Sequence, residues 1–150
     1  VRNDLSKISE NNSVIVEELN GAYSFPNVHQ LISTVIGRLK PGINFSEIIK
    51  ASFPMGSMTG APKYKVLALI DKYEHGSRGL FSGSVGYINP EGDFDFNVII
   101  RSILYNYTHS YLSYFVGSGI TTYSDPLNEW EECLLKGELI KNLLASLSAG

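Results

Sequence analysis

Only one cysteine occurs among the 150 residues, so the chain cannot form an internal disulfide bond. A chain that uses so little cysteine is typical of a reducing compartment, and we expect a cytoplasmic protein. No apolar run reaches the length of about 20 residues that a membrane-spanning helix needs, and the first residues do not resemble a signal peptide. The sequence therefore predicts no membrane partner.

An excess of positive charge is also lacking. The formal net charge is −3, and the 12 lysine and arginine residues do not cluster into a basic stripe. Since proteins that bind nucleic acids present such patches to the phosphates, we expect no nucleic-acid partner. No internal repeat or low-complexity tract is present either.

The composition is that of an ordinary globular protein, with 43% hydrophobic and 18% charged residues. The length suits one domain with a hydrophobic core, so we expect residues 1–150 to form a single domain. Because the chain opens with Val1 directly into a charged polar stretch, we expect a fragment or a processed product whose N-terminal part is missing. A chain trimmed to a stable core is the alternative.

The first half of the chain is predicted to be mainly helical. Apolar side chains recur at helical spacing over residues 27–39, and Asn44 and Glu47 form the capping pattern of a helix that runs to about residue 52. Pro62 suits the first turn of a third helix over residues 63–74. A short β-branched run over residues 13–18 predicts a strand.

The second half changes to a strand pattern. We predict strands over residues 80–89, 93–106 and 110–121, joined by turns at 90–92 and 106–109, followed by a long helix over 126–146. Strands joined by short turns form an antiparallel meander. The expected fold class is therefore α+β, an antiparallel sheet with helices packed on it.

The segment Pro54–Lys63 (Pro-Met-Gly-Ser-Met-Thr-Gly-Ala-Pro-Lys) has unusual chemistry for a linker. Its glycines allow close backbone approach, Ser57 and Thr59 offer hydroxyl groups, and Lys63 adds a positive charge at a helix start. Such a loop could hold a carboxylate or a phosphate, although it lacks the Gly-Lys-Ser/Thr ending of nucleotide-binding loops. A plain helix cap on a tight turn explains the same residues.

Acidic residues gather at the start of the terminal helix. Glu129, Glu132 and Lys136 share one face, whereas Glu131 points elsewhere and is expected to be solvated. Leucines 135, 139 and 143 lie near the same stripe, so we expect this face to be turned toward the protein. Two inward carboxylates need a cation, and Mg²⁺ carried by a carboxylated substrate is a natural partner. A plain preference of acidic residues for a helix N-terminus is the alternative.

Three predicted strands carry further candidate residues. Arg101 lies among β-branched neighbours, where it is either buried and paired or aimed at an anion such as a carboxylate. Gly117 and Gly119 suggest close backbone approach to a ligand or another segment. Tyr87 fits the core as well as it fits a site.

Taken together, these motifs resemble those of the chorismate-binding family, nearly along the whole chain. The family includes the large subunits of anthranilate synthase and aminodeoxychorismate synthase, with isochorismate and salicylate synthases as more distant members. The matching segments are Arg2–Leu5, Val16–Leu19, Gly37–Gly42, Gly56–Lys63, Arg78–Gly79, Gly83–Tyr87, Ile100–Arg101, Gly117–Gly119 and Ser124–Lys136. The resemblance implies that the α+β fold is part of the chorismate-binding fold.

The resemblance also implies substrate-binding roles. Tyr87 and Arg101 match residues that contact the carboxylate-bearing side of chorismate, and Ser57 matches a Thr or Ser near the substrate. The backbone at Gly117 and Gly119 matches the part that holds a substrate carboxylate.

Metal-binding and catalytic roles follow in the same way. Glu129 and Glu132 match magnesium ligands, and Lys136 matches a catalytic neighbour of that site. Gln30 stands where the family often has a histidine near the leaving C4 hydroxyl. His29 is one position away, about 100° around the predicted helix, so it cannot simply substitute.

Two groups that the family uses, a further magnesium-binding glutamate and a lysine-bearing motif, would precede Val1. We therefore expect the chain to be inactive alone. The segments Val28–Thr34 and Phe81–Gly86 are more similar to the aminodeoxychorismate branch, in which ammonia from a glutamine amidotransferase partner replaces the C4 hydroxyl of chorismate. Anthranilate synthase is the first alternative, and a non-catalytic fragment or inert relative is the second. Self-association through exposed strand edges is a further expectation.

Overall fold

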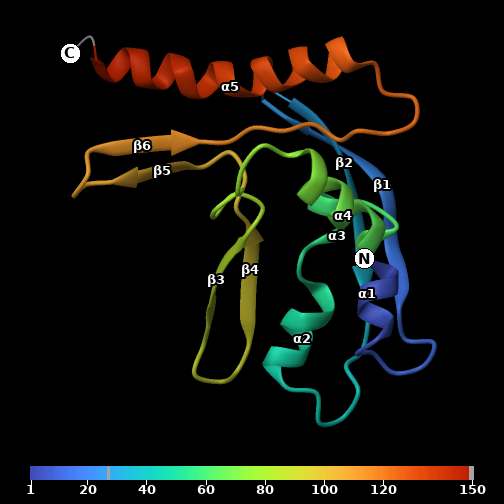
Figure 1. Cartoon of the computed structure of the whole chain (residues 1–150). Coiled ribbons are helices and arrows are strands. Elements are labelled where there is room, and N and C mark those ends of the chain that lie inside the picture. Colours follow the sequence, from blue (N-terminus) through green and yellow to red (C-terminus); the bar gives the residue numbers. More distant parts are fainter. Residues whose placement is uncertain (27, 149–150) are drawn as a thin grey trace. The chain divides into compact units, whose positions relative to one another are not determined.

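The computed structural model describes residues 1–26 and 28–148, which belong to two compact units, Val1–His75 and Gly76–Gly150 (Figure 1). The first unit contains α1 (Arg2–Ser6), β1 (Ile15–Phe25), β2 (Val28–Ile36), α2 (Phe45–Ser52), α3 (Gly56–Thr59) and α4 (Lys63–Tyr73). The second contains β3 (Ser84–Ile88), β4 (Phe94–Val98), β5 (Ile103–Asn106), β6 (Tyr111–Tyr114) and α5 (Pro126–Ser148).

Strands β1 and β2 form a long antiparallel hairpin, with partners from Ile15↔Ile36 to Phe25↔Val28 and irregularities between Val16 and Gly21. The helix predicted over residues 27–39 is therefore wrong. Its apolar spacing fits both periods, but residues 32 and 34–36 are β-branched, and such side chains favour strands. Pairing with β1 supplies the hydrogen bonds that decide between the two.

The other predicted helices of this unit are confirmed. At α2, Asn44 Oδ1 accepts from the Glu47 N–H at 3.1 Å, and the Asn44 N–H donates to Glu47 Oε2 at 3.0 Å, which is the predicted capping box. Helix α4 ends at Tyr73, one residue before the predicted end, and the Tyr73 side chain is exposed. The short helices α1 and α3 lie where no helix was predicted.

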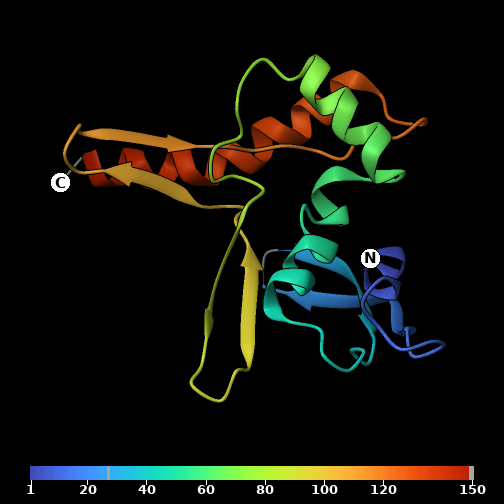
Figure 2. The ribbon, with the colours of Figure 1, turned by 60° about the horizontal axis from the view of Figure 1, so that its bottom comes forward.

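The second unit contains two separate hairpins, β3–β4 and β5–β6 (Figure 2). The single strand predicted over residues 93–106 is wrong, because an irregular segment separates β4 from β5. Arg101 has φ of +52°, outside the strand region, and the Ser102 hydroxyl donates to the Ile100 carbonyl at 2.9 Å. The meander is therefore replaced by independent two-stranded sheets, while the α+β class with antiparallel pairing is confirmed.

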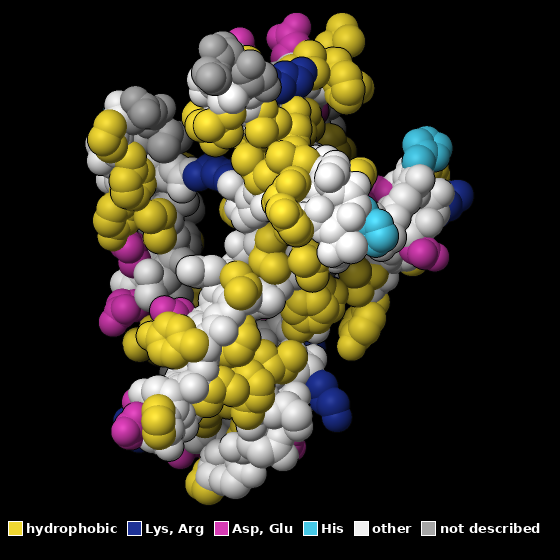
Figure 3. Space-filling model, turned by 90° about the vertical axis from the view of Figure 1, so that its left-hand side faces the viewer, with side chains coloured by type: hydrophobic (Ala, Val, Ile, Leu, Met, Phe, Trp, Pro, Cys, Tyr) yellow, Lys and Arg dark blue, Asp and Glu magenta, His cyan; other side chains and the backbone are white. Residues whose placement is uncertain are grey.

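Few hydrophobic side chains are buried. Among the side chains of residues 1–26 and 29–147, only Ile8 and Ala51 are buried hydrophobic residues, whereas Leu31, Ile120 and Leu139 are each more than 70% exposed. Hydrophobic side chains accordingly cover much of the face drawn in Figure 3. No helix of the described residues is both long enough and apolar enough to cross a membrane.

Gly37 marks a tight contact in the first unit. A Cβ at this position would lie 2.6 Å from Ser9 Oγ, and Ser9 is 2% exposed, so the added methyl has little room. We expect Gly37→Ala to lower the free energy of unfolding by about 1–3 kcal/mol, measured by urea denaturation. The loss caused by Gly37→Ala should be smaller in a Ser9→Ala background, when the double variant is compared with Ser9→Ala alone, than in the wild type. No recovery would show that the contact with Ser9 is not the cause.

Candidate functional site

Helix α5 begins at a well-formed cap. Asp125 Oδ1 accepts from the backbone N–H groups of Leu127 and Asn128, both at 3.0 Å. A side-chain oxygen at this position satisfies the free donors of the first turn and fixes where the helix starts. The cap therefore sets the positions of Glu129, Glu132 and Lys136, which follow on successive turns.

Lys136 links the helix to the glycine segment that follows β6. Its Nζ lies 2.5 Å from Glu132 Oε1 and donates to the Gly117 carbonyl at 2.9 Å. The side chains of Lys136 and Glu132 are 38% and 50% exposed, so the pair is accessible to solvent. One ammonium group thus joins the predicted metal-binding and substrate-binding segments.

Glu129 is held as a carboxylate by the same segment. The hydroxyl groups of Ser124 and then Ser118 act most strongly to lower the pKa of Glu129 below its ordinary value; a smaller effect of burial opposes them, and the positive charge of Lys136 adds the smallest contribution. Ser124 is itself fixed, since its Oγ accepts from the Thr121 N–H at 2.9 Å. The lowered pKa favours the ionised carboxylate.

The structure thus brings five predicted residues into one cluster: Gly117, Gly119, Glu129, Glu132 and Lys136. The local structure around them differs from the prediction. The strand predicted over residues 110–121 is β6, which ends at Tyr114, so Gly117 and Gly119 lie in the irregular segment that follows it. Leucines 135, 139 and 143 are 68%, 76% and 51% exposed, so the stripe expected to face the protein does not do so.

Ser118 and Ser124 were not predicted as site residues. Ser118 lies between the two glycines, and Ser124 directly precedes the capping Asp125. Their positions next to predicted site residues could have suggested them from the sequence, since a serine hydroxyl readily donates to a carboxylate. Which carboxylate they reach depends on the fold of the loop, and that is not visible in the spacing.

The carboxylates of Glu129 and Glu132 fit an Mg²⁺ ion that takes its other ligands from water and substrate. Among residues 1–26 and 28–148, no group of three or more His, Cys, Asp or Glu side chains is placed to hold a metal ion. Mg²⁺ commonly uses one or two carboxylates and takes its remaining oxygen ligands from water and substrate. Glu129 and Glu132 match that requirement, whereas a dedicated protein cage would need more donors.

Tyr87 and Arg101 belong to the same unit as this cluster. Tyr87 lies on β3 opposite Asp95 and is 64% exposed, so it is not a core residue in this chain. Arg101 is exposed in the break between β4 and β5, with φ of +52°. A left-handed conformation in a non-glycine residue is a local strain that is often found at functional positions.

Gln30 and Ser57 belong to the first unit. Gln30 lies on β2 opposite Tyr23, while His29 lies opposite Ser24, whose Oγ is 2.9 Å from His29 Nδ1. Neighbouring strand residues point to opposite faces, so the 100° separation expected on a helix becomes about 180°. His29 still cannot take the place of Gln30.

Ser57 is exposed on α3, but the lysine of its loop is already paired. Lys63 Nζ lies 2.8 Å from Asp4 Oδ2, and the two side chains are only 14% and 9% exposed. The expectation that Lys63 supplies a free positive charge for an anion is therefore not met.

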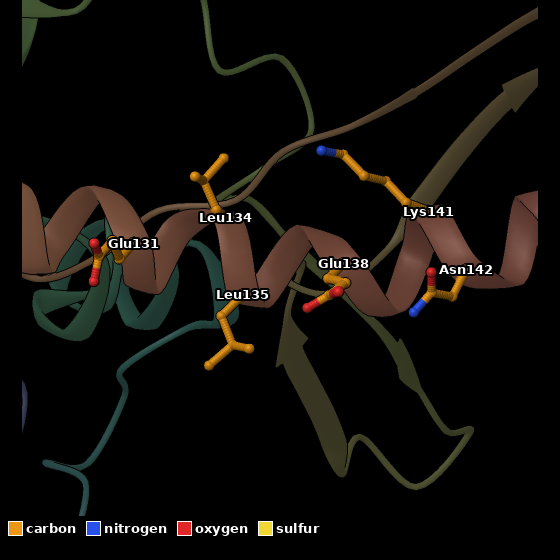
Figure 4. A pocket seen from close by; sticks show the side chains of 6 residues that line it. All are labelled: Glu131, Leu134, Leu135, Glu138, Lys141 and Asn142. Atoms are coloured by element: carbon orange, nitrogen blue, oxygen red, sulfur yellow. The ribbon is translucent and has the colours of Figure 1, made fainter.

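A hollow of about 500 Å³ runs along α5 and contains none of the predicted site residues; it is lined by Glu131, Leu134, Leu135, Glu138, Lys141 and Asn142 (Figure 4).

Comparison with known proteins identifies relatives of this chain. It is 40% identical over 136 residues to the chloroplastic aminodeoxychorismate synthase of Arabidopsis thaliana, covering 91% of this chain and 15% of that protein. It is 37% identical over 150 residues to the aminodeoxychorismate synthase of Streptomyces griseus, covering 100% of this chain and 20% of that protein.

A solved structure shares the fold. The crystal structure of anthranilate synthase component I from Streptococcus pneumoniae TIGR4 matches 90% of this chain and 31% of that chain, with a TM-score of 0.76 and 33% sequence identity. The chain thus spans less than a third of the length of these relatives. Residues 1–142 match the profile described as chorismate binding enzyme, and the chain belongs to that family.

Proposed function

We propose that this chain supplies part of the chorismate site of an aminodeoxychorismate synthase, which replaces the C4 hydroxyl of chorismate with ammonia. The cluster in which Lys136 joins Glu132 to the Gly117 carbonyl carries the proposal, because a carboxylate suited to a cation lies beside a glycine backbone suited to a substrate carboxylate. The two relatives named aminodeoxychorismate synthase support this branch, at 40% and 37% identity.

The residues of the chain divide the work of binding and orienting the substrate. Arg101 and Tyr87 are suited to a carboxylate, Arg101 through paired N–H donors and Tyr87 through its hydroxyl. The Gly117–Gly119 backbone can approach a carboxylate closely because no side chain intervenes at either glycine. Ser57 and Gln30 offer uncharged hydrogen-bonding groups.

Glu129 and Glu132 would hold Mg²⁺, which when bound offsets negative charge on the substrate as the hydroxyl leaves. The Ser124 and Ser118 side chains lower the pKa of Glu129, which favours the charged form that a metal ion binds. Lys136 keeps Glu132 and the Gly117 carbonyl within one hydrogen-bonded link, which aligns the two parts of the site.

Further polypeptide is needed to complete the enzyme. The described hairpins are two-stranded, and isolated pairs of this kind are marginal in water. The chain also leaves most of its large hydrophobic side chains exposed, which requires a covering partner. We propose that this partner is the remainder of a chorismate-binding polypeptide, as in the longer relatives, and that a glutamine amidotransferase supplies the ammonia. In its absence, the free edges would favour self-association.

A product assay tests the function. The chain alone, with chorismate, Mg²⁺ and ammonium, is expected to give no product. When it replaces the matching segment of the Streptomyces griseus enzyme, the chimera should form aminodeoxychorismate, identified by mass spectrometry. An inactive chimera that is folded would contradict the proposal.

Anthranilate synthase is the alternative, favoured by the 33% identity to the Streptococcus pneumoniae structure. A matching chimera in that protein decides between the two. We expect the chimera built in the aminodeoxychorismate synthase to retain a larger fraction of its parent's activity than the chimera built in the anthranilate synthase. The reverse order would favour the anthranilate branch.

A further inference from the structure

Asp4 lies at the centre of a charged cluster that the roles above do not use. Its Oδ2 is 2.8 Å from Lys63 Nζ, and its Oδ1 is 3.3 Å from Lys7 Nζ. The Asp4 and Lys63 side chains are almost buried, whereas that of Lys7 is 45% exposed. The contact between Asp4 and Lys63 is therefore the one most protected from solvent screening.

This contact holds the C-terminal end of the segment Gly56–Lys63, which carries Ser57, because Lys63 begins α4 and pairs with Asp4 on α1. At the other end, Gly56 begins α3 close to the start of the chain, since a Cβ at Gly56 would lie 3.6 Å from Val1 N and 3.9 Å from Asp4 Oδ2. Ser57 lies between these two ends, exposed to solvent.

The interior of the segment has its own fixed conformation. The Thr59 side chain is buried and its Oγ1 donates to the Met55 carbonyl at 3.0 Å. The Gly60 N–H donates to the Gly56 carbonyl at 2.8 Å, and Gly60 has φ of +104°, which a residue with a side chain rarely adopts. A segment that is hydrogen-bonded internally and anchored at its Lys63 end holds Ser57 in one place.

The pairing also argues against Lys63 as a substrate ligand. To bind an anion, the Lys63 ammonium would have to leave Asp4, and the almost buried carboxylate would keep only the longer contacts with Lys7 at 3.3 Å and the Val1 α-ammonium at 4.0 Å. Removing one member of a buried pair is strongly unfavourable. Lys63 is therefore engaged in holding the loop rather than free to bind a ligand.

We propose that Asp4 and Lys63 are positioning residues, which anchor the segment Gly56–Lys63 so that Ser57 is presented to a carboxylated substrate. The substrate part of this statement rests on the proposed function. The anchoring part rests on the geometry alone.

Amide hydrogen exchange in the Streptomyces griseus chimera tests the anchor. Lys63→Met should speed exchange of the amides of residues 56–61 by at least about tenfold more than it speeds exchange of the α2 amides. Lys7→Met is the matched control, since it also removes a partner of Asp4 but lies outside the segment, and it should leave residues 56–61 unchanged. Lys63→Arg, which keeps the charge, should remain close to the wild type.

Two results would overturn the anchor: unchanged exchange of residues 56–61 in Lys63→Met, or an equal increase throughout α2 and the segment. Lys63→Gln provides a milder variant that keeps a hydrogen-bond donor, and it should give a smaller but still local increase. A uniform increase in this variant as well would mean that the pair only stabilises the unit as a whole.

A second measurement adds chorismate. In the chimera, millimolar chorismate should slow exchange of residues 56–61 when the chain is wild type or Lys63→Arg, and this protection should fall at least fivefold in Lys63→Met. Absence of protection in the wild type would contradict the proposed function, even where the anchor is supported by exchange without ligand. Equal protection in the wild type and Lys63→Met would overturn the positioning role.

Discussion

Glu132→Gln is expected to lower the rate of the completed enzyme by about 100-fold and to weaken Mg²⁺ binding by about 10- to 100-fold, as is typical when a metal-site group is removed. The amide oxygen is neutral and a weaker ligand for Mg²⁺ than a carboxylate. The variant also removes the ion pair that now holds Lys136. The rate should be measured over a range of Mg²⁺ concentrations in the chimera, and Mg²⁺ binding by calorimetry.

Glu131→Gln is the matched control for this experiment. Glu131 is on the same helix, one residue away, but it lines the hollow along α5 rather than the cluster with Gly117. The same loss of charge should therefore leave the Mg²⁺ dependence of the rate unchanged. If Glu132→Gln and Glu131→Gln give the same Mg²⁺ titration as the wild type, Glu132 is not a metal ligand.

How far the sequence predicted the fold depended on how local the deciding interaction is. The capping box of α2 is formed by residues three apart, and it was predicted correctly. Strand β2 was predicted as a helix because its apolar spacing fits both periods and its pairing partner lies across a turn. The break at Arg101 was missed because a positive φ in a non-glycine residue leaves no mark on the hydrophobic pattern.

The same distinction holds for the site. Glu129, Glu132 and Lys136 were placed together by helix geometry, which is local, and the structure confirms that they lie in one cluster. Lys63 was expected to be free because its partner Asp4 is distant in the sequence. An isolated positive charge beside a glycine-rich loop is thus ambiguous until its long-range partner is known.

Asp4→Asn is expected to give the largest change in stability, about 3–5 kcal/mol in the free energy of unfolding of the first unit, because it leaves the Lys63 ammonium almost buried without a counter-charge. The effect should depend on pH. Burial acts to raise the pKa of Asp4, but hydrogen bonds and charges from Lys63 and Lys7 outweigh it, so the pKa is lowered from its ordinary value of 3.8.

A lowered pKa in the folded state means that the carboxylate stabilises the fold fully above pH 3.8, and that this contribution is lost as the pH falls through the folded pKa. The wild type and Asp4→Asn should therefore differ most near pH 7 and converge in acid, measured by urea denaturation at each pH. Lys7→Met, whose side chain is 45% exposed, should cost no more than about 1 kcal/mol at pH 7. A difference between the wild type and Asp4→Asn that stays constant down to pH 2 would mean that the charge of Asp4 does not stabilise the unit, and the loss would then come from packing of the side chain.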